Sequence, residues 1–159
     1  MKGTDVGRYD LVLERVAASI RGTADDRAAM EAAVQTLERE VHDYTWVGIY
    51  LLDGNELVLG PFVGKPSPHT RIPLGRGICG AAATERTTII VDDVSADPRY
   101  LACSIETKSE IVTPIMLDGD VLGEIDIDSD KPAAFGSADR ALLEKVAALL
   151  APRLPTHAS

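Results

Sequence analysis

The first forty residues carry apolar side chains at helical spacing. Their recurrence every three or four positions places them on one face of a helix that ends near Gly22. Thr23, followed by Asp26, resembles a capping box with Asp in place of Glu and predicts that a second helix starts here. The apolar positions of the two predicted helices are Tyr9, Val12, Val16 and Ile20, then Met30, Val34, Leu37 and Val41.

From Thr45 onward the pattern becomes typical of strands. Residues 46–52 are rich in β-branched and aromatic side chains, and residues 56–60 return after the turn residues 53–55. This combination predicts a β-hairpin. The following stretch, 61–73, contains four prolines, which predicts an irregular loop that ends in a short strand.

The second half of the chain predicts a short helix, three strands and a final helix. Asp118-Gly119 is the preferred composition of a tight turn and joins the last two strands. Ser137 is the expected cap of the final helix, with Pro152 and Pro155 ending it. The predicted elements are a helix at 78–86, strands at 88–91, 110–117 and 121–128, and a helix at 137–150.

Strands joined by tight turns form antiparallel sheets, so we predict an α+β fold. Helices from both ends of the chain should cover one face of the sheet, and the long loops should cover the other. A length of 159 residues suits one domain with a proper core. We expect N-terminal helices at 1–42, a core at 44–150 and a tail at 151–159 whose last residues fray.

Composition excludes several classes of function. The formal net charge of −9, without a basic stripe, argues against binding to nucleic acid. The sequence has no apolar run of roughly 18 to 20 residues, so no membrane span is expected. The N-terminus lacks the pattern of a secretory signal, which predicts a cytoplasmic protein. Its two cysteines are then more typical of reduced, catalytic or inert thiols than of a structural disulfide.

Two cysteines and a row of acids are the candidates for chemistry. Cys79 and Cys103 could form a redox pair or could be small core residues. Glu124, Asp126 and Asp128 alternate with isoleucines, so all three share one face of a strand. That face is either a ligand site or the solvent-exposed side of the strand. The histidines show no metal-ligand spacing, so no metal site is expected.

Five segments in order resemble a GAF domain and, more narrowly, the free methionine-(R)-sulfoxide reductase family. The resemblance runs from about Tyr44 to Leu150 and implies a single GAF domain over 1–159. The segments that carry it are Leu59-Gly-Pro-Phe62, Arg76-Gly-Ile-Cys79-Gly80, Ala102-Cys103, Ser109-Glu110-Ile-Val-Thr-Pro114 and Asp126-Ile-Asp128-Ser129.

The resemblance implies a role for each matching residue. Cys103 falls on the nucleophilic cysteine of the family, and Cys79 falls on a second cysteine. The positions that match substrate-contacting residues are Glu110, Asp126 and Asp128, with the aromatic pocket wall at Trp46 and Tyr50. From the pattern alone, these two aromatic residues face the same side of a strand and could equally be plain core.

Position 69 departs from the family pattern. Many members carry there a third cysteine, often the resolving thiol, and this chain has His69. The resemblance implies an enzyme that reduces free methionine-(R)-sulfoxide without a bound cofactor. An intramolecular disulfide would be reopened by an external, thioredoxin-like dithiol.

The alternative to an enzyme is a GAF domain that does not catalyse a reaction. In that reading the chain is a GAF sensor, active in signalling, that binds a small ligand or reports oxidant through Cys79 and Cys103. The position-69 replacement favours this alternative, and the complete set of thiols and acids favours the enzyme. The N-terminal and C-terminal helices could also mediate a homodimer, which is common in this fold family.

Overall fold

The computed structural model describes residues 3–101 and 106–155, so Cys103 and the last four residues of the expected tail lie outside the described part. The elements are α1 (Gly3–Arg21), α2 (Asp26–Glu40), β1 (Trp46–Asp53), β2 (Glu56–Val63), β3 (Arg71–Pro73), α3 (Gly77–Glu85), β4 (Ile89–Val91), η1 (Val94–Ala96), β5 (Ser109–Leu117), β6 (Asp120–Ser129), α4 (Ser137–Leu150) and η2 (Ala151–Arg153). Among the described helices, none has the length and apolar character of a membrane span.

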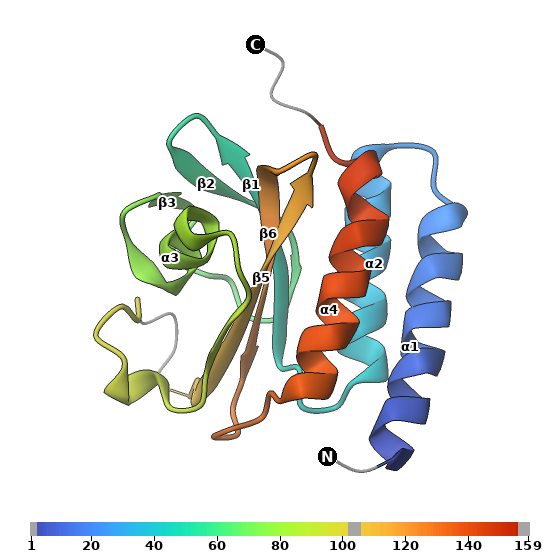
Figure 1. The fold of residues 1–159 in the computed structure, drawn as a ribbon, viewed down its shortest axis with the longest axis horizontal. Coiled ribbons are helices and arrows are strands. Elements are labelled where there is room, and N and C mark those ends of the chain that lie inside the picture. The colour runs from blue at the N-terminus through green and yellow to red at the C-terminus, as the bar shows by residue number, and fades with distance from the viewer. Residues whose placement is uncertain (1–2, 102–105, 156–159) are drawn as a thin grey trace.

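A single six-stranded sheet forms the centre of the molecule. Its strand order is β3-β2-β1-β6-β5-β4, and every neighbouring pair is antiparallel. α1, α2 and α4 lie on one side of this sheet, and α3 lies on the other side (Figure 1). The predicted α+β arrangement, with terminal helices on one face and loops on the other, is therefore confirmed.

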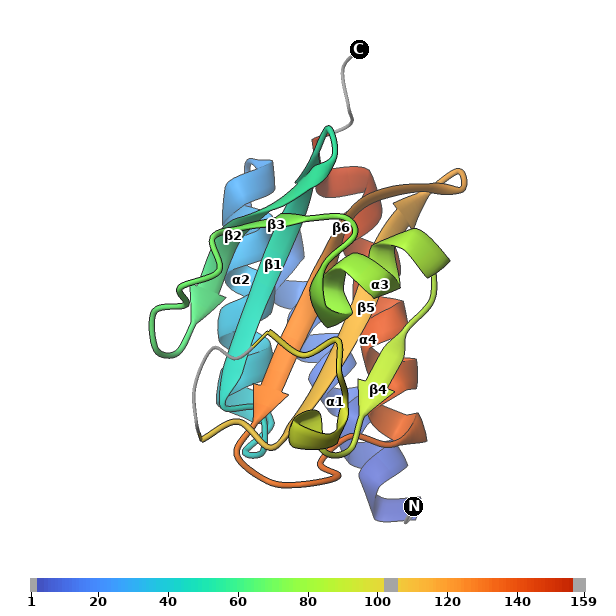
Figure 2. The same cartoon turned by 90° about the vertical axis from the view of Figure 1, so that its left-hand side faces the viewer.

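Each face of the sheet has its own apolar core. On the helical side, the alternate residues Ile125 and Ile127 of β6 pack with buried side chains of α1, α2 and α4. On the other side, Tyr50 and Val112 pack with Ile78 and Cys79 of α3. Figure 2 faces this second side, where α3 and the chain around η1 lie over the strands. The central strands are consequently buried on both faces, and the side of the sheet that α3 covers has a packed core of its own.

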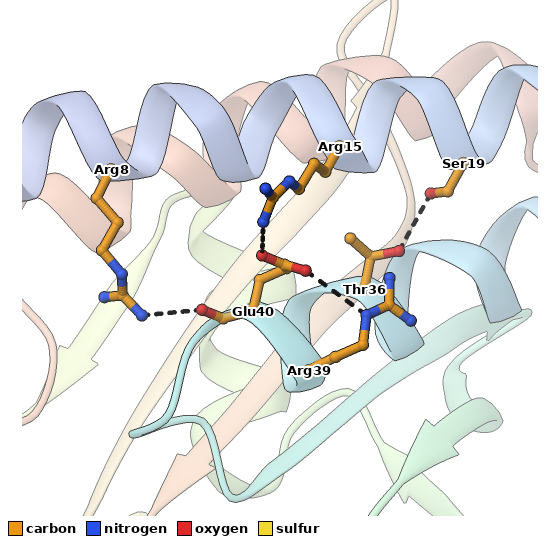
Figure 3. Close-up of polar contacts among 6 residues, drawn as sticks. All are labelled: Arg8, Arg15, Ser19, Thr36, Arg39 and Glu40. Carbon is orange, nitrogen blue, oxygen red and sulfur yellow. Dashed lines mark hydrogen bonds and ion pairs between the residues drawn. The ribbon is translucent and has the colours of Figure 1, made fainter.

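Polar contacts join α1 to α2 along their exposed edge (Figure 3). A guanidinium nitrogen of Arg8 donates to the backbone carbonyl of Glu40 over 2.8 Å, and Arg15 forms an ion pair with the Glu40 carboxylate. Thr36 Oγ1 donates to Ser19 Oγ at 3.3 Å. Exposed contacts of this kind contribute little, and the buried stripe that includes Val16 and Leu37 stabilises the pair.

Two predicted helix caps are wrong, the first by two residues and the second by one. Asp25, rather than Thr23, precedes α2, and its carboxylate accepts a hydrogen bond from the Ala28 backbone N–H at 2.8 Å. At α4 the capping residue is Gly136 rather than Ser137. The Gly136 N–H donates to the Asp139 carboxylate at 2.9 Å, so the side chain that caps the start of this helix is an acid in its first turn rather than the serine hydroxyl.

Two stretches expected to be irregular are more ordered than the sequence indicates. β2 continues through Pro61 to Val63, because Pro61 falls at an irregularity in the β1–β2 register and beyond the residues that pair with β3. At the C-terminus, η2 follows α4 directly, and Leu154 is buried against the helical core. The chain thus stays packed beyond the expected end of the fold at residue 150.

Candidate active site

β6 supplies a row of buried acids. Glu124, Asp126 and Asp128 alternate with Ile125 and Ile127, so their side chains share the face opposite the helical core. Their exposed fractions are only 0%, 4% and 5%. The interpretation of this row as the wet side of a strand is therefore wrong, because α3 and the neighbouring loops exclude water from it.

Glu110 of β5 extends the row sideways. It lies directly opposite Asp128 in the β5–β6 register and is also buried, with 6% of its surface exposed. One of its carboxyl oxygens lies within 4.8 Å of a carboxyl oxygen of Asp126 and of the Cys79 sulfur. Buried carboxylates this close repel each other, and a proton held by one of them relieves the repulsion. The arrangement therefore favours the protonated form of at least one acid.

Burial changes the acidity of the β6 carboxyl groups. Loss of water raises the pKa of Glu124 well above 4.5, and the nearby charge of Asp126 raises it further. Desolvation likewise raises the pKa of Asp126 and of Asp128, and the hydrogen bond with Glu110 offsets part of the effect in both. Neutral carboxylic acids near pH 7 can donate protons, which ionised surface carboxylates cannot do.

Cys79 faces this row from the first turn of α3. The helix begins at Gly77, whose positive φ of 72° suits glycine, and Gly80 lies so close to the Leu74 carbonyl oxygen that a Cβ would be only 2.5 Å away. These two glycines let α3 pack tightly over the sheet. The Cys79 thiol thereby reaches Asp126 and donates to its Oδ2 over 3.4 Å.

Cys79 is a protonated thiol in this arrangement. Burial is the main cause that raises the pKa of Cys79, and the charges of Asp126, Glu124 and Glu110 add to it. A thiol attacks only as its thiolate, so this environment makes Cys79 a poor attacking nucleophile. Cys103, the other candidate cysteine, belongs to the stretch 102–105 that the structure does not describe.

The aromatic candidates face the predicted side but line two different hollows. Tyr50 is buried, and its hydroxyl donates to the His69 carbonyl oxygen at 2.8 Å beside Cys79, Glu110 and Asp126. This inner hollow has a volume of about 20 Å³, which is room for about one water molecule.

Trp46 lines an outer hollow of about 90 Å³ together with Asp128. Its indole stacks on Phe62 with 5.7 Å between ring centroids, and Nε1 donates to the Lys65 carbonyl oxygen at 2.9 Å. The indole lies directly over Gly48, where a Cβ would come within 2.4 Å of a ring carbon. Asp128 lines the outer hollow, and Glu110, its partner in the β5–β6 register, lines the inner one.

Several residues that line the two hollows were not predicted as site residues from the sequence. His69, Ile72 and Leu101 line the inner hollow, while Lys65 and Thr107 line the outer one. Most of them come from loops, whose path no local pattern specifies. The one available signal was the proline-rich stretch 61–73, because long irregular loops on a rigid scaffold often carry a binding site.

The site also holds an unexpected set of possible metal ligands. One ligand atom from each of Cys79, Glu110 and Asp126 lies within 4.8 Å of the other two, and all three residues are buried. These residues come from three different elements, so their spacing in the sequence does not indicate a metal site. The arrangement can therefore donate protons, bind a cationic group and present a thiol within one enclosed space.

Comparison with known proteins agrees with this architecture. Residues 25–154 match the family model described as GAF domain. GAF domain-containing protein A of Dictyostelium discoideum is 40% identical over 150 residues, which cover 94% of each chain. Free methionine-R-sulfoxide reductase of Escherichia coli is 38% identical over 120 residues, covering 76% of this chain and 72% of that protein.

A solved structure shows the same fold closely. The X-ray structure of free methionine-R-sulfoxide reductase from Neisseria meningitidis, in complex with its substrate, has a TM-score of 0.90 and is 36% identical, covering 96% of this chain and 92% of that one. Taken with the matched family model and the curated relatives, this similarity shows that the chain belongs to the GAF domain family and, within it, to the free methionine-R-sulfoxide reductases.

Proposed function

We propose that this protein reduces free methionine-(R)-sulfoxide to methionine by thiol chemistry. The observation that carries the proposal is the buried row of acids, with raised pKa values, that faces the Cys79 thiol in an enclosed hollow. The relatives from E. coli and N. meningitidis are free methionine-R-sulfoxide reductases, and we take the substrate from them. Neither a wet strand nor a purely apolar core would need such a cluster.

The substrate's charge and its apolar end match the residues that line the two neighbouring hollows. The ammonium group of a free amino acid would pair with Glu110, Asp126 and Asp128, whose carboxyl groups otherwise face one another. The indole of Trp46 offers an apolar wall for the methyl sulfoxide end. A peptide-bound residue lacks the free ammonium, so the same site would discriminate against it.

Cys103 would carry out the first step, as the family resemblance implies. Its thiolate attacks the electrophilic sulfur of the sulfoxide while a neutral carboxylic acid of the cluster protonates the departing oxygen. The S–O bond of the substrate breaks, and the protonated oxygen is transferred to the cysteine sulfur. The substrate leaves as methionine, reduced by two electrons, and the cysteine, oxidised by two electrons, becomes a sulfenic acid.

Cys79 would resolve that sulfenic acid. Its thiol passes its proton to Asp126, the carboxylate that already accepts its hydrogen bond, and the sulfur then attacks Cys103. The S–S bond forms as the S–O bond of the sulfenic acid breaks, and the departing hydroxyl takes up that proton and leaves as water. This assignment gives Cys79 the resolving role and removes the need for a third cysteine at position 69.

An external dithiol of the thioredoxin type would then reduce the disulfide by exchange, returning both thiols. The cycle needs no bound cofactor, because the electrons pass from the dithiol through the two cysteines. The cytoplasmic location and the homodimer remain predictions beside this proposal.

A turnover assay with single-cysteine variants tests the proposal. Purified protein with excess dithiothreitol should release methionine from the free R epimer, and much more slowly from the S epimer or from a peptide-bound sulfoxide. Cys103→Ser should abolish release. Cys79→Ser should still give about one methionine per chain in a single turnover and should accumulate the sulfenic acid, which a dimedone-type reagent traps.

Two results would count against the reductase. Absence of methionine release from the R epimer would contradict it directly. If the same protein nevertheless showed a saturable thermal shift with methionine sulfoxide or methionine, the ligand-binding sensor would be the better description. Equal activity in Cys103→Ser would contradict the assignment of the nucleophile.

A further inference from the structure

The inner hollow holds more acid than an amino-acid substrate requires. Glu110, Glu124 and Asp126 are all buried close to the Cys79 thiol, with Asp128 paired to Glu110. A single ammonium group compensates one negative charge. The remaining acids are neutralised either by protons, which burial favours, or by a cation of higher charge.

Three of these acids have oxygens with no hydrogen-bond partner among the described residues. Asp126 Oδ1 is one of them, and Asp126 lines the hollow with only 4% of its surface exposed. Asp128 Oδ1 and both carboxyl oxygens of the fully buried Glu124 are the others. Buried polar atoms are nearly always paired in folded proteins. Unpaired acceptors at this depth therefore point to a missing positively charged partner.

The spacing of the ligand atoms suits a small divalent ion. Tetrahedral zinc, with Zn–S near 2.3 Å and Zn–O near 2.1 Å, separates neighbouring ligand atoms by roughly 3.4 to 3.6 Å. Cys79 Sγ and Asp126 Oδ2 are already 3.4 Å apart. The Glu110 oxygen lies within 4.8 Å of both atoms, so a side-chain shift of about 1 Å completes three ligands.

The donor types favour zinc over the alkaline-earth ions. Mg²⁺ and Ca²⁺ prefer oxygen ligands throughout, whereas a thiolate with two carboxylates suits Zn²⁺. The free volume of about 20 Å³ in the same hollow accommodates one ion. We propose that Cys79, Glu110 and Asp126 form a Zn²⁺ site whose occupation excludes the substrate.

Coordination changes the state of the thiol. On binding, the Cys79 proton and any proton held by the two carboxyl groups are released to solvent, and the sulfur becomes a metal-bound thiolate. A sulfur in this state is not available to resolve a sulfenic acid. Zinc would therefore act as a reversible inhibitor, and only this inhibitory consequence rests on the proposed reductase function.

Binding can be measured without substrate. Fully reduced protein, titrated with Zn²⁺ against a chromophoric chelator, should take up one ion per chain and release protons into a weakly buffered solution. Co²⁺ used as a spectroscopic probe should give a thiolate-to-metal charge-transfer band. Cys79→Ser should abolish the band and weaken Zn²⁺ binding by at least 100-fold, because the only sulfur ligand is removed.

Matched variants make this test specific. Cys103→Ser removes the other thiol and should keep the band, so the two single-cysteine variants have opposite expected results. Asp126→Asn should weaken Zn²⁺ binding by at least 10-fold. Asp118→Asn removes the same charge from an exposed turn with φ of 53° and should leave binding unchanged. Thermal unfolding of each variant checks that it is folded.

Several results would overturn the site. These are a cobalt band that survives in Cys79→Ser, a band lost in Cys103→Ser, or equal weakening by Asp118→Asn and Asp126→Asn. Full turnover by zinc-saturated protein would overturn the inhibition and leave the site intact. Because the ion is titrated without sulfoxide, a failure of the reductase assay does not alter the binding result.

Discussion

The two faces of the sheet bury carboxyl groups in opposite ways. On the helical side, Asp139 accepts hydrogen bonds from the hydroxyl groups of Tyr9 at 2.8 Å and Tyr44 at 2.7 Å, and from the Gly136 N–H. On the other side, neither carboxyl oxygen of Glu124 and only one oxygen of Asp126 has a hydrogen-bond partner among the described residues. Both regions are buried, yet only the first surrounds its acid with donors.

This difference separates structural acids from functional acids. Three donors make a buried carboxylate part of the scaffold, because they replace the water that it lost. Burial, followed by the charge of Asp139, raises the pKa of Tyr44, which keeps its hydroxyl group a donor. An acid without donors is held neutral instead, and it stays available to a proton, a ligand or an ion. The pocket side is therefore the costly arrangement that a function must explain.

The largest expected effect is on the helical side. Asp139→Ala leaves two tyrosine hydroxyl groups and one backbone N–H without their shared acceptor, and we expect a loss of about 4 kcal/mol in the free energy of unfolding. Urea unfolding measures it, with Asp118→Asn as a surface control that should change by less than about 0.5 kcal/mol. A loss below about 1 kcal/mol for Asp139→Ala would remove the contrast between the two faces.

The pocket side should show the reverse response. Asp126→Asn removes the acceptor of the Cys79 thiol proton, so kcat/KM with dithiothreitol should fall about 100-fold. Its free energy of unfolding should change by less than about 1 kcal/mol, since the carboxyl group already lacks a full set of donors. A large loss of stability with unchanged turnover would mark Asp126 as scaffold.

The smallest effect sharpens the comparison through pH. The pKa of Glu124 is raised in the folded state, so its neutral form contributes stability that is complete below its ordinary value of 4.5 and is lost as pH rises towards the folded value. The loss reaches at most about 1.4 kcal/mol per pH unit. The Gln side chain of Glu124→Gln does not titrate. The free energy of unfolding of the variant should therefore rise relative to that of the unmodified protein as pH increases from 4.5.

Urea unfolding at several pH values between 4 and 8 gives the two curves of stability against pH. Parallel curves would mean that Glu124 ionises as easily in the folded chain as in the unfolded one. A gap that widened in favour of the unmodified protein would mean that Glu124 has a charged partner after all.

Much of the scaffold could be predicted because its signals are local. The alternation of isoleucine and acid on β6 places three carboxyl groups on one face, and period-2 geometry alone establishes that. The turn at Asp118-Gly119 gives the hairpin in the same way. The caps at Asp25 and Gly136 were missed because several residues that can cap a helix compete within one turn, and small geometric differences decide between them.

The site could be predicted only in part, because its decisive contacts are distant along the chain. Cys79 and Asp126 are 47 positions apart and meet only because α3 crosses the sheet above β6. Whether the acid row is wet or buried depends on the same crossing. The sequence indicates only that His69 replaces a cysteine of the family pattern. Its place in the inner hollow follows from the loop path, which no periodicity encodes.

The position of Trp46 gives the protein a built-in optical signal. It is the only tryptophan in the sequence, and its indole lies half-buried against Phe62 on the wall of the outer hollow beside Asp128. Any molecule that enters there must change the polarity around that ring. Intrinsic fluorescence, excited selectively at the indole, should therefore follow occupancy of the hollow in real time without a label.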